Sequence, residues 1–162
     1  MSEMCIRDSI WNITPAGTAI DGFLMLHFPE QLRFRPMRWC IFRFRAQTQR
    51  TTCLLYTSFN SSERKQFLIS IAQNADELKK SGFTDKDIQK LMVGFVPNGW
   101  QVHHKFPLDD SGTNAFDNLI LIRNSPYHKV ITNYQNYITK GFAVGSENEI
   151  DWPVLPGWMY PM

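Results

Sequence analysis

The stretch GWQVHHKFPLDDSGTNAFDNLILIRNSPYHKVITNYQ, residues 99–135, decides the fold of this 162-residue chain. Residues 100–106 begin with alternating apolar side chains and predict a strand, and the unbroken apolar run Leu119–Ile122 predicts a second, buried strand. Residues 109–118 are rich in Asp, Ser, Gly and Asn and predict a loop between the two strands. The Ser-Pro pair that follows predicts a helix start with Ser125 as its N-cap.

Strand, loop, strand and helix in this order bring four polar residues to one small place: His103, His104, Asn118 and His128. Adjacent side chains of a regular strand point to opposite faces. Both members of the histidine pair can therefore serve one site only where the strand ends or bulges, and Pro107 just downstream permits this.

The paired histidines, the asparagine 14 residues after His104 and the histidine ten residues after Asn118 resemble the HNH nucleases. This ββα-metal superfamily includes colicin-type DNases, the phage recombination endonuclease VII and toxin domains of bacterial polymorphic toxins. The resemblance implies that His104 is the general base and that His103 and His128 bind one divalent metal ion. It also implies that Asn118 braces the loop so that the base keeps its orientation.

Several relatives in this superfamily carry a further metal-binding histidine where this chain has Thr132. Fewer nitrogen ligands favour Mg²⁺ or Mn²⁺ over Zn²⁺, without excluding zinc. The carboxylates of Asp109 and Asp110 either complete the metal shell or make local hydrogen bonds within the loop. The basic residues near the motif are expected either to meet phosphates or to be solvated; they are Lys105, Arg123 and Lys129.

The function that the resemblance implies is a metal-dependent hydrolase of DNA phosphodiester bonds, an endonuclease with little sequence specificity, with RNA left open as a substrate. We expect the toxin domain of a larger bacterial effector, delivered into the cytoplasm of a target cell and paired with an immunity protein. The alternative is a module that holds nucleic acid or a structural metal without cutting. His27 lies outside the motif and is interpreted as a bystander.

Basic residues change in type near residue 60. Residues 1–60 contain seven Arg and no Lys, whereas residues 61–141 contain eight Lys and two Arg. The runs MCIRDS (4–9) and CLLYTS (53–58) resemble translated sequencing-adapter reads. We therefore interpret residues 1–58 as a doubtful, poorly ordered segment and residues 59–162 as the nuclease domain, with the motif at 99–141, able to fold and act alone. The alternative is a genuine Arg-rich strand or membrane-surface face.

The fold expected for the nuclease domain is α+β, with two helices before the ββα motif. The first helix begins at Ser61 or Ser62 and ends near Gly82; the second begins at a capping box formed by Thr84 and Asp87. The tail after Gly141 is expected to be irregular, with its tryptophans, Trp152 and Trp158, covering the core.

The amino-acid composition excludes some classes of protein but does not indicate a function. The net charge of +2 is too mild to identify a nucleic-acid binder by itself. The three cysteines have no CxxC spacing, so a zinc knuckle and a disulfide framework are both disfavoured, and free thiols are expected. We expect no membrane span, since the longest purely apolar runs, such as residues 23–26, are too short to cross a bilayer, and we expect no secretory signal.

Overall fold

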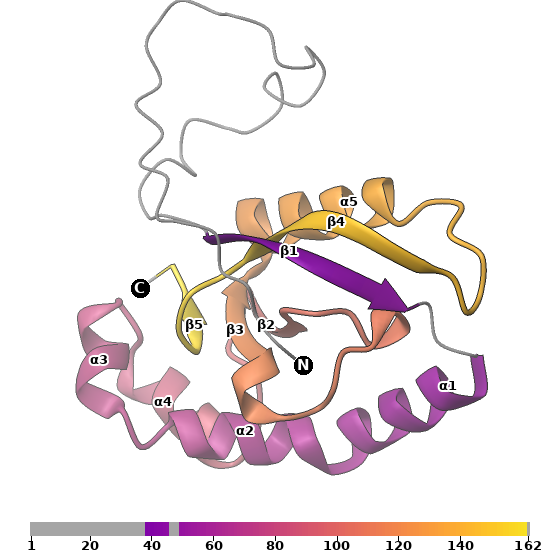
Figure 1. The fold of residues 1–162 in the computed structure, drawn as a ribbon. Helices are drawn as coiled ribbons and strands as arrows, with labels where there is room; N and C mark the ends of the chain where they lie inside the picture. The colour runs from indigo at the N-terminus through magenta and orange to yellow at the C-terminus, as the bar shows by residue number, and fades with distance from the viewer. Residues whose placement is uncertain (1–37, 46–48, 162) are drawn as a thin grey trace, which may run out of the picture.

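The structure is a computed structural model that describes residues 38–45 and 49–161 as a mixed arrangement of helices and strands (Figure 1). The expectation of poor order for residues 1–58 falls largely on residues 1–37 and 46–48, which lie outside the described residues, as does His27. Within the described part, no helix combines the length and the apolar character that a membrane span requires.

A small sheet holds the motif. Its strands are β2 (Trp100–His104), β3 (Leu119–Arg123) and β5 (Met159–Tyr160), in the order β2-β3-β5. β2 and β3 are antiparallel and β3 and β5 are parallel. The two strands predicted from the sequence are confirmed, although β2 ends at His104, before the predicted Phe106.

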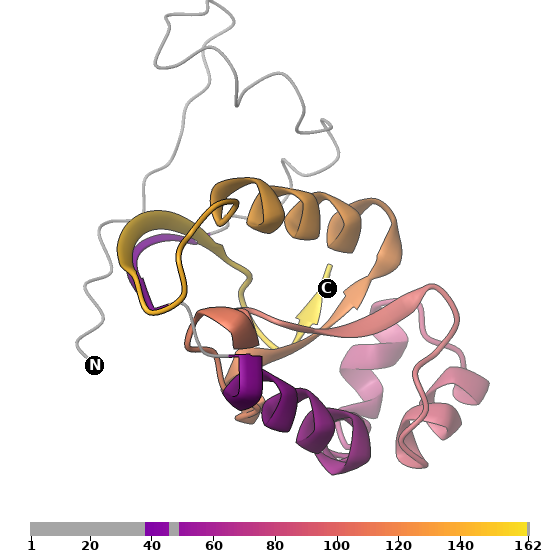
Figure 2. The same ribbon diagram turned by 90° about the vertical axis from the view of Figure 1, so that its right-hand side faces the viewer.

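The two faces of β3 belong to different cores because successive side chains of a strand point to opposite sides. One face packs into a cluster with the N-terminal helices, which includes Phe59, Phe67, Leu91, Leu119 and Leu121. The other face packs under the last helix, in a cluster that includes Ile120, Ile122, Ile131 and Leu155. Figure 2 shows the sheet edge-on between these layers, with α5 on one side and α1 on the other.

The helices before the sheet differ from the prediction. α1 (Gln49–Ser58) continues through a π-helical turn (Phe59–Glu63) into α2 (Arg64–Ile71). A helix start at Ser61 or Ser62 is therefore wrong: both hydroxyls donate to the carbonyl of Ser58 inside the continuous helix instead of capping a new one.

The single helix expected to reach Gly82 is interrupted at Asn74. Its backbone (φ −92°, ψ 49°) leaves the helical region, and its side-chain amide donates to the carbonyl of Ile71, so α3 (Ala75–Lys80) is a separate helix. The next helix, α4 (Asp85–Met92), has the predicted capping box: Thr84 accepts from the Asp87 backbone, and the Asp87 carboxylate accepts from the Thr84 backbone.

The helix after the sheet follows Ser125, whose backbone is extended (φ −121°, ψ 133°) in agreement with a position before a helix. A π-helical turn (Asn124–His128) leads into α5 (Lys129–Ile138), three residues shorter than the predicted end at Gly141. His128 therefore lies at the junction of the turn and α5, in the first part of the helical segment.

The irregular tail expected after Gly141 is wrong. β4 (Glu147–Val154) pairs antiparallel with β1 (Arg38–Arg45), and the two strands lie side by side along α5 in Figure 1. Arg43 and Glu149 form an ion pair of 2.7 Å across this ribbon. The paired strands lie about a hundred residues apart in sequence, so no local turn signal announced the pairing.

Candidate functional site

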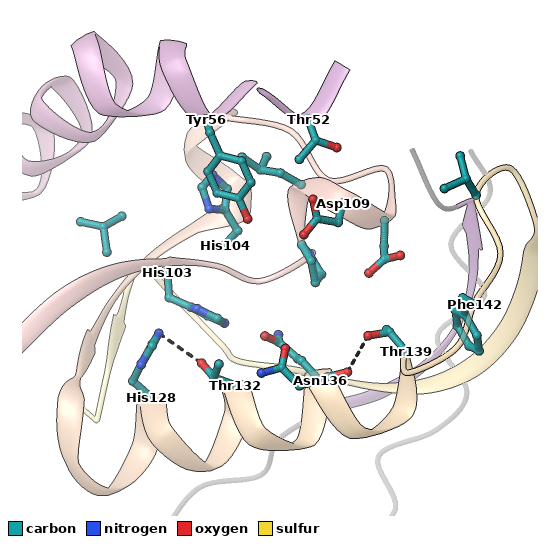
Figure 3. A pocket seen from close by; sticks show the side chains of 16 residues that line it. Thr52, Tyr56, His103, His104, Asp109, His128, Thr132, Asn136, Thr139 and Phe142 are labelled. Carbon is teal, nitrogen blue, oxygen red and sulfur yellow. Dashed lines mark hydrogen bonds between the residues drawn. The ribbon is translucent and has the colours of Figure 1, made fainter. Parts of the chain in front are cut away.

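The histidines of the motif open onto one cavity of about 550 Å³. Figure 3 shows that it lies between α1, the end of β2, the turn at Leu108–Asp110 and the polar side of α5. We call it the histidine cavity. It collects His103, His104 and His128, and Asn118 stands behind it rather than in its wall.

The paired histidines point to opposite sides of β2, as strand geometry requires. His103 pairs with Ile120 and points toward α5, whereas His104 pairs with Leu119 and points toward α1 (Figure 3). Both nevertheless line the histidine cavity, because the strand ends at His104 and the cavity wraps around that end. The strand end that the sequence analysis required for both histidines to serve one site is therefore present.

His104 is held in one tautomer by its neighbour. Its Nε2 lies 2.9 Å from the Asn114 side-chain oxygen, and the Asn114 amide nitrogen donates to the Leu55 carbonyl at 2.9 Å. Because that second bond fixes which end of the amide faces the ring, Nε2 must donate, and Nδ1 carries the lone pair. The imidazole also packs against the Phe59 ring, with centroids 4.5 Å apart and the ring planes tilted by 58°. Burial lowers the pKa of His104, partly offset by the bond to Asn114, so the neutral ring prevails near pH 7.

Asn118 spans the loop that follows β2. Its side-chain oxygen accepts from the Phe106 backbone N–H at 2.8 Å, and its amide nitrogen donates to the carbonyls of Phe106 and Thr113 at 3.0 and 2.7 Å. One buried side chain thus ties both ends of the loop that carries Asn114. The loop-bracing geometry expected of Asn118 is present in these three bonds.

His103 and His128 face each other across the cavity, with ring centroids 4.9 Å apart and planes nearly perpendicular. The Nε2 atom of His103 is buried and has no hydrogen-bond partner among the described residues, while His128 Nε2 lies 3.2 Å from the Thr132 hydroxyl. Burial, with smaller contributions from His128 and His104, lowers the pKa of His103 to about 3. Burial also lowers the pKa of His128. Both imidazoles are therefore neutral near pH 7, and their rings are neighbours.

Two carboxylates stand on the opposite wall, where Asp109 and Asp110 occupy the short turn after Pro107. Burial, reinforced by Asp109, raises the pKa of Asp110. Within the described residues, no three His, Cys, Asp or Glu side chains come together as a ready-made metal cluster. The unpartnered Nε2 of His103 beside His128 nonetheless offers a pair of nitrogen donors to a divalent ion, whereas Asp109 and Asp110 do not join that pair in a three-residue cluster.

The basic residues near the motif, expected either to meet phosphates or to be solvated, do not line the cavity. Lys105 donates to the Asp117 carbonyl at 2.7 Å. The Arg123 guanidinium lies 5.8 Å from the centre of the Trp100 ring, at the other end of the sheet from the histidines, and Lys129 is exposed. Among the described residues, the lining contains neither Lys nor Arg.

Sequence reasoning missed two parts of the wall. Thr52 and Tyr56 come from α1, inside the segment that was interpreted as doubtful. The polar side of α5 was missed as well, although a helical spacing from His128 could have revealed it; the residues are Thr132, Gln135, Asn136 and Thr139.

A comparison with curated proteins finds the uncharacterized protein YhhZ of Escherichia coli K12. The two are 44% identical over 107 residues, which is 66% of this chain and 27% of YhhZ, so the chain spans about a quarter of the length of that relative. No protein-family model matches the chain. No solved structure matches it. Any function must therefore be argued from the site itself.

Proposed function

We propose that the chain is a metal-dependent endonuclease of the HNH, or ββα-metal, class that hydrolyses DNA with little sequence specificity. The observation that carries the proposal is the fixed tautomer of His104: its Nε2 donates to Asn114, which leaves Nδ1 as a basic nitrogen, and the same cavity is lined by His103, whose Nε2 has no partner among the described residues. The order β2, β3, α5 around this pair supports the class, because it is the order that the resemblance implies.

The residues that would hold the metal are His103 and His128, while Asp109 and Asp110 line the same cavity without clustering with them. A bound divalent ion would supply charge neutralisation at the phosphate and the leaving oxygen. Their lowered pKa values keep both imidazoles neutral near pH 7, so no proton has to be displaced from either ring before coordination.

The role proposed for His104 is to take a proton from the attacking water at Nδ1. Burial keeps the ring neutral and therefore able to accept that proton, and the bond from Nε2 to Asn114 stabilises the imidazolium that forms. Asn118 acts through the loop, because its three bonds hold the segment that carries Asn114. Asn118 is therefore a positioning residue.

The biological setting proposed is that of a bacterial toxin domain, acting in the cytoplasm of a target cell after delivery within a larger effector and neutralised by an immunity protein. Its support is the resemblance of the 99–135 stretch to toxin-type nuclease domains. DNA is the proposed substrate, and a parallel assay with RNA tests whether RNA is cleaved as well.

The test is cleavage of supercoiled plasmid by the full chain with Mg²⁺ or Mn²⁺, with and without a chelator. We expect nicked and linear products that disappear with the chelator. An RNA transcript in parallel reports the DNA preference. A chain that binds plasmid in the presence of either ion yet leaves it intact would instead support the non-cleaving binding module.

A further inference from the structure

The cavity-facing side of α5 is polar along its length. His128, Thr132, Gln135 and Thr139 follow one another at intervals of four, three and four residues, so they share one face of the helical segment. Figure 3 shows Thr132, Asn136 and Thr139 along this side, with Phe142 beyond its end. A helix normally turns an apolar face inward, as Ile131 does here toward the core. The polar side is therefore a wall of the histidine cavity rather than part of the core.

Gln135 is the unexplained member of this wall. Its side chain is only 7% exposed, and its amide nitrogen has no hydrogen-bond partner among the described residues. The Thr139 hydroxyl donates to the backbone carbonyl of Gln135 at 2.9 Å, but this bond does not involve the side-chain amide of Gln135. A buried, unpaired amide is destabilising unless something else satisfies it. A ligand in the cavity would do so.

The charge of the lining indicates what kind of ligand fits. Among the described residues the lining carries no Lys or Arg, and it includes Asp109 and Asp110, which disfavour a second phosphate. Gln135 and Asn136 each offer an amide donor and an amide acceptor, which match the mixed edge of a nucleobase and suit adenine best. The Phe142 ring at the end of the wall offers a surface on which a base can stack.

The size of the histidine cavity allows a phosphate at the histidine end and a base farther along α5. Thr139 lies eleven positions after His128, and the helical rise of about 1.5 Å per residue separates the two by about 16 Å. A cavity of about 550 Å³ lies within the range of small-ligand sites. The reacting phosphate and a neighbouring base therefore need not compete for the same space.

We infer that the histidine cavity takes one unstacked nucleobase, preferentially adenine, next to the phosphodiester being cut, and that Gln135 and Asn136 hydrogen-bond its edge. The inference rests on the proposed nuclease function and deepens it. A base inside a cavity cannot also be stacked in a duplex, so the substrate class becomes single-stranded or locally opened nucleic acid. An intact duplex should be bound and cut less well.

The test measures binding apart from cleavage. The full chain, in a chelator, is titrated into a short fluorescent single-stranded oligodeoxyadenylate, the oligothymidylate of equal length and a duplex, with anisotropy as the readout. We expect the adenylate to bind tightest and the duplex weakest. Gln135→Leu should weaken adenylate binding about tenfold or more and reduce the difference between the two single strands.

The matched control is Asn133→Leu, which removes an exposed amide from α5 outside the cavity lining and should bind like the wild type. A merely structural Gln135 predicts a lower melting temperature for Gln135→Leu. A ligand-binding Gln135 predicts an unchanged or higher melting temperature together with weaker binding. Asn136→Ala, at an exposed position, provides the same binding test should Gln135→Leu fail to fold.

The outcomes separate this inference from the nuclease proposal. Suppose that the wild type cuts plasmid and that a folded Gln135→Leu binds the adenylate as tightly as the wild type does. This result overturns the base site and leaves the nuclease proposal intact. Asn136→Ala gives the same reading where Gln135→Leu does not fold. A wild type that prefers duplex to single strands also overturns it. A wild type that neither binds an oligonucleotide nor cuts nucleic acid overturns both.

Discussion

The Asn114 side chain decides which nitrogen of His104 is basic, because it is itself fixed by the Leu55 carbonyl. The chemistry proposed for the site depends on this short chain of hydrogen bonds as much as on the histidine. The sequence gives no indication of it, because Leu55 and Asn114 are 59 residues apart and ordinary in type.

Asn114→Ala should slow plasmid nicking about 10- to 100-fold while metal affinity stays close to that of the wild type. The reason is that His104 loses the partner that fixes its tautomer, whereas His103 and His128 are untouched. Nicking rates and calorimetric Mn²⁺ titrations measure the two effects. Thr113→Ser, at an exposed position in the same loop, keeps the hydroxyl that accepts from the Ala115 backbone and serves as the control. Equal rates for Asn114→Ala and wild type would remove Asn114 from the account.

His103 should make the stability of the metal-free protein depend on pH. Its pKa is about 3 in the folded chain and near the ordinary 6.5 when unfolded, so the unfolded state binds the proton first as pH falls. The free energy of unfolding that depends on a neutral His103 is fully present above pH 6.5 and is lost progressively toward pH 3. The loss is about 2 kcal/mol at pH 5. Urea unfolding in a chelator at pH 7 and pH 5 measures the loss. His103→Asn should lose less by about that amount, and an equal loss in both proteins would contradict the assignment.

Among the elements, α1 changes the interpretation of the chain most. It carries Thr52 and Tyr56 into the cavity wall and supplies the Leu55 carbonyl to Asn114. Its last residues continue into the π-helical turn at Phe59–Glu63 without a break, so a boundary at residue 59 would cut a continuous helical segment.

Residues 38–162 keep both α1 and the β1–β4 pairing and should therefore cleave plasmid like the full chain. Residues 59–162 should be at least tenfold less active, since His104 then lacks the anchored Asn114. Parallel nicking assays and thermal melts of the two fragments and the full chain measure the difference. Full activity in residues 59–162 would support the boundary inferred from amino-acid usage instead.

The elements predicted well from sequence are those with local signals. The capping box at Thr84, the apolar run of β3 and the Ser-Pro start of the last helical segment all rest on neighbouring residues, and all three are found. The β1–β4 ribbon and the role of α1 rest on contacts between distant segments. Periodicity and turn chemistry carry no information about such contacts.

For the molecule as a whole, the C-terminal segment closes the structure around the site. The tryptophans were expected to bury, and Trp152 is fully buried while Trp158 packs partly exposed against the helical core cluster. The Trp152 indole donates to the Lys105 carbonyl at 2.8 Å, directly after His104. β4 therefore supports the end of β2 at which the catalytic pair is proposed.

Trp152→Ala should lower the free energy of unfolding by about 3–5 kcal/mol, because it leaves a cavity where a fully buried ring stood. Trp158→Ala, at a partly buried position, should cost clearly less and serves as the comparison. Urea unfolding of both variants beside the wild type measures the difference. The opposite ranking would mean that the C-terminal ribbon is peripheral.

The central claim is that His104 acts on water while His103 and His128 hold the metal, and it is tested most directly by comparing two variants. His104→Ala should reduce plasmid nicking at least 100-fold with Mn²⁺ affinity nearly unchanged. His128→Ala should weaken Mn²⁺ binding at least tenfold and reduce nicking with it. Calorimetric Mn²⁺ titration of each variant beside its nicking rate decides the matter. Loss of Mn²⁺ binding in His104→Ala, with binding and nicking both retained in His128→Ala, would contradict the account.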